Sequence, residues 1–186
     1  MDQTTIYIVI AVVAAVVALA VIAVLMTKRR SSAKLRDRFG PEYGRVVEDA
    51  GGRKAAEAEL HQREKRVEQF KLHPLPDGAR DQFLADWKRI QGEFVDDPKD
   101  AIVRADEFLQ QVMSARGYPV TDFEQRAEDL SVEHPVVVEN YRVAHDIAVR
   151  HVRGEANTED LRQAMLHYRT LFDELAGAPV AESTHA

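Results

Sequence analysis

Three aspartates and four histidines are the side chains of this chain whose types and spacing suit metal chemistry. Asp96, Asp97 and Asp100 form a DDxxD pattern, a spacing of carboxylates that suits Mg²⁺ bound to a diphosphate. That chemistry needs the carboxylates on one helix face and a second acidic motif opposite them, yet Pro98 interrupts the pattern and no second copy exists. We therefore expect Asp97 to cap a helix that begins at Pro98, with Asp100 in its first turn.

Four histidines of the C-terminal half would form a metal site only if they converged with carboxylates: His134, His145, His151 and His167. His145 shares a helix face with Tyr141, whereas His151 follows six residues later, nearly on the opposite side. The predicted helices contain no HExxH or Glu-x-x-His pair. We expect these histidines to be hydrogen-bonded in the core or at its polar edge, and we predict no metal site and no cofactor.

Motifs for other kinds of catalysis are missing as well. The chain has no cysteine, and none of its serines lies in a GxSxG elbow. Gly51-Gly52 has no Lys-Ser or Lys-Thr after it, so it does not resemble a phosphate-binding loop. We predict no enzymatic activity and no catalytic or cofactor-binding residue. One alternative stays open: a metal-dependent enzyme acting on a lipid or envelope precursor through the aspartates or the histidines.

The most pronounced feature lies at the N-terminus. Ile6 to Met26 is a run of 21 residues without charge, proline or glycine. As a helix it is roughly 31 Å long, which matches a hydrocarbon core of about 30 Å. It lacks the basic start, short apolar run and small-residue end of a cleaved signal peptide. We predict a signal-anchor: a transmembrane helix over residues 6–27, after a short extracytoplasmic tail of residues 1–5.

Basic residues gather directly after this span, whereas only Asp2 and the amino terminus precede it. Because basic flanks stay in the cytoplasm, the N-terminus is expected outside and the C-terminal domain inside the cell. We expect the basic residues to contact the lipid bilayer and its anionic headgroups. The predicted membrane-interface residues are Lys28, Arg29, Arg30, Lys34, Arg36 and Arg38.

Charge is unevenly distributed along the chain, whose net charge is −6. Between Lys28 and Lys71 there are 13 basic and 8 acidic residues, and after Lys71 there are 12 and 22. The basic part therefore adjoins the predicted membrane. Its basic residues alternate with four glutamates from Arg53 to Phe70 and have no aromatic neighbours to stack on bases, so nucleic-acid binding is not expected.

Apolar spacing and caps predict only helices after the span, and no segment alternates as a strand does. Residues 28–52 form a basic juxtamembrane segment with Gly and Pro breaks and a short helix near 42–49, and residues 53–71 a charged helix that packs by one edge or forms a stalk. Residues 72–176 form a helical bundle domain, with a disordered tail at 177–186. The expected bundle helices cover 79–95, 98–117, 121–130, 135–154 and 158–177.

Within the bundle, Phe83, Trp87, Ile90 and Phe94 fall on one helix face and are expected in the core. The expected N-terminal caps are Asp77, Asp97, Thr121 in a capping box with Glu124, and Asn157 or Thr158. The predicted fold class is all-α: an N-terminal transmembrane helix followed by a soluble antiparallel helical bundle of about five or six helices.

Four segments carry a resemblance: FGPEYGRVVEDAGG, RKAAEAELHQREKRV, DWKRIQGEFVDDP and RGYPVTDFEQRAEDLSVEHPVVVENYRVAH. They are similar to a group of single-pass membrane-anchored helical proteins of actinobacteria and related bacteria that have no assigned function. The resemblance implies a bacterial inner-membrane location, and it assigns no functional residue.

The function that these observations favour is a membrane-anchored binding or scaffolding module, with another membrane protein as a possible partner. A self-assembling structural protein is the other alternative. The pairs Ala11–Ala15 and Ala14–Ala18 would let two spans approach closely, and the charged helix from Arg53 would pair with its copy in a homo-oligomer. The partner and the physiological process do not follow from the sequence.

Overall fold

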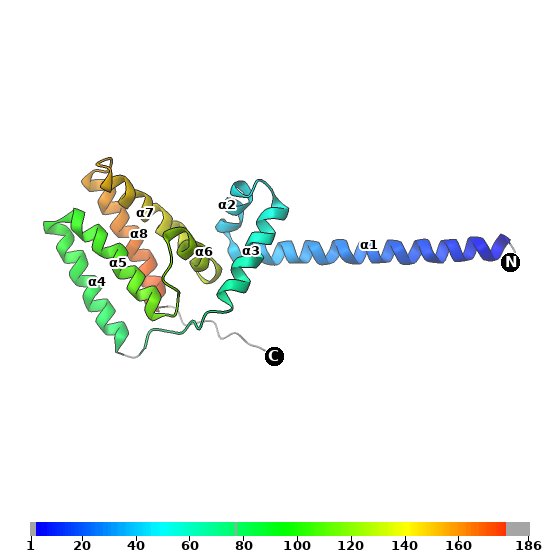
Figure 1. The fold of residues 1–186 in the computed structure, drawn as a ribbon, viewed down its shortest axis with the longest axis horizontal. Coiled ribbons are helices and arrows are strands. Elements are labelled where there is room, and N and C mark those ends of the chain that lie inside the picture. Colours follow the sequence, from blue (N-terminus) through cyan, green and yellow to red (C-terminus); the bar gives the residue numbers. More distant parts are fainter. Residues whose placement is uncertain (1–2, 77, 178–186) are drawn as a thin grey trace.

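The computed structural model describes residues 3–76 and 78–177, which form eight helices and no strand (Figure 1). The predicted all-α class is therefore confirmed. Seven described helices follow the first one, and they correspond to the short helix, the charged helix and the five bundle helices expected from the sequence. The helices are α1 (Gln3–Phe39), α2 (Pro41–Asp49), α3 (Arg53–Val67), α4 (Ala79–Asp96), α5 (Pro98–Ala115), α6 (Phe123–Glu133), α7 (Val138–Val152) and α8 (Thr158–Gly177).

α1 is one continuous helix of 37 residues, roughly 56 Å long, and most of it extends away from the other helices (Figure 1). Residues 28–39 contain no glycine or proline and continue the helix, so the predicted juxtamembrane segment is broken only beyond them. The first break comes at Gly40, whose φ of +47° favours glycine, and Pro41 then begins α2. The predicted short helix near 42–49 is present as α2.

Most of the predicted transmembrane stretch consists of residues whose side chains the structure does not describe. These are residues 4–15, 18, 21, 24 and 25. Among the described residues, no helix has both the length and the apolar character needed to cross a membrane. Residues 1–2 and 178–186 of the two predicted tails also lie outside the described part of the chain.

We call the end of α1 from Leu35, together with α2 and α3, the N-terminal unit. Its helices pack around a small apolar core in which Phe39, Val46 and Leu60 are fully buried. The other members of this core are Leu35, Tyr43, Ala56, Val67 and, from α6, Val132. α3 therefore packs against three other helices, and the alternative of a free-standing stalk is wrong. Its short apolar stripe suffices because α1, α2 and α6 each cover part of it.

α4 to α8 form what we call the C-terminal bundle. α4, α5, α8 and α7 lie side by side in that order, and α6 crosses between them and the N-terminal unit (Figure 1). The core of the bundle contains fully buried Leu109, Tyr141, Tyr168 and Phe172. This arrangement fits the predicted helical bundle, and it supplies the helix order that the sequence left open.

An aromatic cluster lies at the centre of the bundle. The ring of Trp87 is stacked between Phe108, with ring centroids 5.8 Å apart, and Phe172, at 5.2 Å. Phe83 meets Phe108 edge to face at 5.7 Å. The predicted stripe on α4 is thus a core face: Trp87 and Ile90 are buried, and Phe83 and Phe94 pack against the same core.

The N-terminal caps of the helices can be compared one by one with those predicted from the sequence. The side chain of Asp97 accepts hydrogen bonds from the backbone N–H groups of Lys99 and Asp100, as predicted. Asn157 caps α8 in the same way. The predicted Thr121 cap is wrong: Asp122 accepts from the N–H of Gln125 instead, because a residue one position later fits the same spacing. Asp77 lies outside the described residues.

The boundaries of two bundle helices also differ from the expectation. α6 continues to Glu133, so the predicted linker of residues 131–134 is mostly helical, and α7 begins at Val138 rather than at Pro135. His134 ends α6 with a non-helical backbone, and residues 135–137 form a turn. The residue before a proline is biased away from helical geometry, which explains why the break falls here.

Candidate functional site

A cleft of about 720 Å³ lies where α1 passes the beginning of α3. A volume of this size is typical of small-molecule sites. Four cations and one carboxylate line the cleft, so its interior is positive. The lining residues are Arg29, Ser31, Ser32, Ala33 and Arg36 of α1, and Arg53, Lys54 and Glu57 of α3.

Contacts between the three helices of the N-terminal unit hold this cleft in shape. The guanidinium of Arg36 lies over the ring of Tyr43, 5.5 Å from its centroid. The Tyr43 hydroxyl donates a 2.9 Å hydrogen bond to Glu57, and Glu57 lies 3.6 Å from Arg53. α1, α2 and α3 are thereby connected at the cleft through side chains of opposite polarity.

Glu57 remains ionised in this setting. Burial alone would raise its pKa, but hydrogen bonds from Ser32 and Tyr43 and the positive charge of Arg53 hold the pKa below its usual value. The pKa of the Tyr43 hydroxyl is raised by burial and by its hydrogen bond to Glu57, so it stays a donor. The carboxylate is therefore occupied by neighbours within the protein.

The six predicted membrane-interface residues do not share one environment. Arg29 and Arg36 line the cleft, and Arg30 and Lys34 are exposed on α1. Arg38 instead donates hydrogen bonds to Glu64 of α3 and Glu133 of α6, at 3.0 and 3.1 Å. The remaining residue, Lys28, has its side chain outside the described ones.

Sequence reasoning did not assign Arg53 and Lys54 to this site. They were interpreted as the start of a charged helix, and nothing local connects them to the α1 residues of the cleft, which lie 17 or more residues earlier. The available signal was the pair of glycines before them, Gly51 and Gly52, which lets the chain reverse and bring α3 back beside α1.

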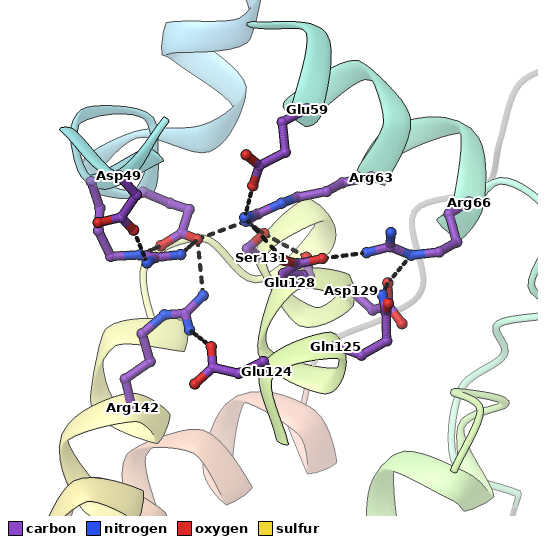
Figure 2. Close-up of polar contacts among 12 residues, drawn as sticks. Asp49, Glu59, Arg63, Arg66, Glu124, Gln125, Glu128, Asp129, Ser131 and Arg142 are labelled. Atoms are coloured by element: carbon purple, nitrogen blue, oxygen red, sulfur yellow. Dashed lines mark hydrogen bonds and ion pairs between the residues drawn. The ribbon is translucent and has the colours of Figure 1, made fainter. Parts of the chain in front are cut away.

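A second polar feature is a network of buried charges where the N-terminal unit meets the C-terminal bundle (Figure 2). The side chain of Glu42 is 1% exposed and accepts hydrogen bonds from three arginines of three helices. These are Arg45 of α2 at 2.7 Å, Arg63 of α3 at 2.8 Å and Arg142 of α7 at 3.0 Å. Burial alone would raise the pKa of Glu42, but these arginines hold it below the usual value.

Arg63 continues the network into α6. Its side chain is 3% exposed and also contacts Glu59, Glu128 and the Ser131 hydroxyl (Figure 2). Glu59 lies one turn before Arg63 on the same helix, a spacing that favours ion pairs. Nothing in the residues around Arg63 indicates that it is buried.

Arg66, one turn after Arg63, contacts Glu128 at 2.9 Å and Asp129 at 2.6 Å. Asp129 also accepts a hydrogen bond from Gln125. Burial raises the pKa of Asp129, and the neighbouring Arg66 offsets only part of this rise. Arg63 and Arg66 together fix α3 against α6.

Three of the four histidines contact different partners, and His151 is half-buried near the end of α7. His134 lies 3.0 Å from Glu174, and His167 lies 2.7 Å from Asn140. His145 stacks on Phe123 with ring centroids 3.6 Å apart. In the described part of the chain, no group of three or more His, Asp or Glu side chains is arranged to hold a metal ion.

His145 and Tyr141 do meet a carboxylate in the bundle. His145 Nδ1 lies 4.0 Å from Asp106, which accepts a hydrogen bond from Tyr168, and Arg126 donates to the Tyr141 hydroxyl. Burial raises the pKa of Tyr141 to about 12 and lowers that of His145. The two tyrosine hydroxyls have hydrogen-bond partners inside the bundle, whereas the buried Nδ1 of His145 has none among the described residues.

The aspartates of the DDxxD pattern also diverge. Asp97 caps α5, Asp100 lies 3.7 Å from Arg104, and Asp96 is an exposed residue at the end of α4. These three aspartates and the four histidines therefore do not converge on a shared metal site in the described part of the chain.

Comparison with known proteins adds no further assignment: no protein-family model matches the chain, and neither a curated protein nor a solved structure is significantly similar to it.

Proposed function

We propose that this chain is a single-pass protein of the bacterial inner membrane whose helical bundle is a binding or scaffolding module held at the cytoplasmic membrane surface. The apolar stretch from Ile6 to Met26 supports the span, and the basic residues after it support the orientation. The resemblance to membrane-anchored bacterial proteins supports the location.

The observation that carries the proposal is the continuity of α1. One helix runs from the apolar stretch into the folded part, where Leu35 and Phe39 of its last turns are buried. No flexible linker separates the two, so the bundle would be held at a fixed distance and angle from the bilayer. A rigid mount of this kind restricts the search for a membrane-bound partner to two dimensions and raises effective concentration.

Self-assembly through α3 finds less support. Ala56, Leu60 and Val67, the apolar residues that would pair two copies, are buried within the N-terminal unit. The structure does not describe the side chains of the alanine pairs in the span, so pairing through them rests on the sequence alone.

The topology can be tested with single cysteines because the chain has none of its own. Thr5→Cys and Ser183→Cys place one thiol near each end. A membrane-impermeant maleimide should label Thr5→Cys in intact spheroplasts and Ser183→Cys only after lysis. Alkaline carbonate should leave both variants in the membrane pellet. Extraction by carbonate, or labelling of Ser183→Cys in intact spheroplasts, would contradict the proposal.

The charge argument has its own test. Reversing Lys28, Arg29 and Arg30 to glutamate removes the cations nearest to the span, so the labelling pattern of the two ends should exchange in part of the population. A matched reversal of Lys88, Lys99 and Arg169, exposed residues of the bundle, should leave it unchanged. An unaltered topology after the first reversal would refute the orientation argument.

A further inference from the structure

We infer that the cleft between α1 and α3 binds the phosphate of an anionic lipid headgroup. The inference rests on the proposed membrane anchoring and gives the site and the ligand chemistry that anchoring alone does not supply. It adds Arg53 and Lys54, which lie outside the basic run after the span, to the residues that meet the lipid.

The position of the cleft fits the headgroup layer. If the hydrocarbon core ends near Met26, Arg29 lies roughly 5 Å and Arg36 roughly 15 Å further along α1. The polar layer on each side of a bilayer is about 5 to 8 Å thick. The Arg29 end of the cleft therefore lies at the depth of the lipid phosphates, and the Arg36 end lies further from the hydrocarbon core. The connection between α2 and α3, which precedes Arg53, lies on the side of the folded part that faces the free end of α1 (Figure 1).

The chemistry of the lining fits a phosphate. Arginine offers a planar fork of donors that matches phosphate oxygens, and two of the three arginines, Arg29 and Arg36, come from a helix that enters the bilayer. Arg29 and Lys54 have no carboxylate partner among the described residues, whereas Arg38, just outside the cleft, has two. The Ser31 hydroxyl adds a neutral donor near the same space.

Glu57 is the one lining residue that would repel an anion. Its carboxylate is engaged by the Tyr43 hydroxyl, by Ser32 and by Arg53, so its charge is largely compensated within the protein. Its ion pair with Arg53 also keeps the Arg53 guanidinium at the cleft. The net charge that an entering phosphate meets remains positive.

The test uses the full chain in detergent micelles, with lipid retention measured by native mass spectrometry. Wild-type protein should retain phosphatidylglycerol in preference to phosphatidylcholine. Arg53→Glu/Lys54→Glu should lower phosphatidylglycerol retention roughly tenfold or more, because each cation near an anionic lipid contributes about a fivefold factor. The control Lys88→Glu/Lys99→Glu makes the same change in net charge on exposed residues of α4 and α5 and should retain lipid like the wild type.

The variant is suited to the question for two reasons. Arg53 and Lys54 lie in the first turn of α3, where acidic residues favour a helix, so the variant should fold, as circular dichroism would check. They also lie more than 20 residues beyond the span, outside the range in which charge sets topology, so membrane insertion should be unchanged. Carbonate extraction of the variant therefore reports on the proposed anchoring separately from lipid retention.

The charge-preserving swap Arg53→Lys/Lys54→Arg should restore most of the retention. Unchanged phosphatidylglycerol retention in Arg53→Glu/Lys54→Glu would overturn the inference, since the basic run of α1 would then account for all lipid contact. Displacement of phosphatidylglycerol by inorganic phosphate alone, without preference for the lipid, would also overturn it by assigning the cleft to a soluble anion.

Discussion

The C-terminal bundle and the N-terminal unit bury very different side chains. The bundle has a large apolar core with Trp87, Phe108 and Phe172 stacked at its centre. The N-terminal unit has eight core residues, and its surface against the bundle is formed largely by buried charges around Glu42 and Arg63. One region is held by area removed from water, and the other is attached mainly by directional contacts.

The difference concerns geometry more than strength. An apolar interface tolerates small shifts, whereas the hydrogen bonds of Glu42 to three arginines are satisfied in only one arrangement of α2, α3 and α7. Buried ion pairs of this kind contribute modestly to net stability because desolvation offsets their attraction. In this protein they set the angle between the bundle and α1, which is what the membrane mount proposed above would require.

Removing the centre of the apolar cluster should have the largest effect. Phe172→Ala leaves a cavity beside Trp87 and Phe108 and should lower the free energy of unfolding by about 3 to 5 kcal/mol. Urea denaturation of the full chain in micelles measures this, and hydrogen exchange localises it to α4, α5 and α8. Leu166→Ala, at a half-exposed position of the same helix, should cost well under 2 kcal/mol. Equal loss of protection in α2 and α3 would show that the two regions are one cooperative unit.

Breaking the charge network around Glu42 should give the second-largest loss of stability. Glu42→Gln leaves the buried Arg63 and the partly buried Arg142 without their shared carboxylate and should cost about 3 kcal/mol. The loss of hydrogen-exchange protection should fall on α2 and α3, with the bundle core unaffected. Glu48→Gln, on the exposed face of the same helix, is the control and should change little. Protection lost first in α5 and α8 would contradict the separation.

A smaller effect is expected at the point where the connection between the two regions touches the bundle. Gly117 follows α5 with φ +92°, and an added Cβ would collide with the backbone carbonyl oxygen of Lys71, in the segment between α3 and α4. Gly117→Ala should therefore cost roughly 2 kcal/mol. Gly92→Ala, inside α4 with open space around it, should instead stabilise by about 1 kcal/mol. Similar effects of the two variants would rule out this explanation.

The same contrast explains what the sequence predicts well. The stripe of Phe83, Trp87 and Ile90 is a local pattern, because residues three and four apart share a helix face whatever the rest of the chain does. The caps at Asp97 and Asn157 are local too, and both were predicted. Most of the bundle therefore follows from periodicity and capping.

The N-terminal unit depends on contacts that are distant in sequence. Glu42 and Arg142 are 100 residues apart, and nothing in either neighbourhood selects the other as its partner. The cleft likewise needs α3 to turn back along α1, so Arg53 and Lys54 could not be assigned to it from spacing. Charged residues on a helix are usually solvated, so the local sequence offers no reason to place Arg63 in the interior, where the structure buries it.

The smallest predicted effect is a difference in how the stability of the two regions depends on pH. Burial lowers the pKa of His134 and of His145, both in the bundle, despite the nearby carboxylates of Glu174 and Asp106. Below about pH 6.5 the unfolded chain binds protons that the folded bundle does not, so bundle stability falls as the pH decreases. The pKa of Glu42 lies below its usual value of 4.5, so the charge network loses stability only in more acidic solution.

Between about pH 7.5 and about pH 5.5 the bundle should therefore weaken while α2 and α3 stay docked. Urea denaturation across this range measures the slope, and His134→Gln/His145→Gln should flatten it, because both titrating groups are gone. Asp129 acts in the opposite direction near its own pKa, since its raised value favours the folded state on protonation, and this delays the loss of the network further. Undocking of α2 and α3 before any weakening of the bundle would mean that the charges, rather than the buried histidines, govern the response to mild acid.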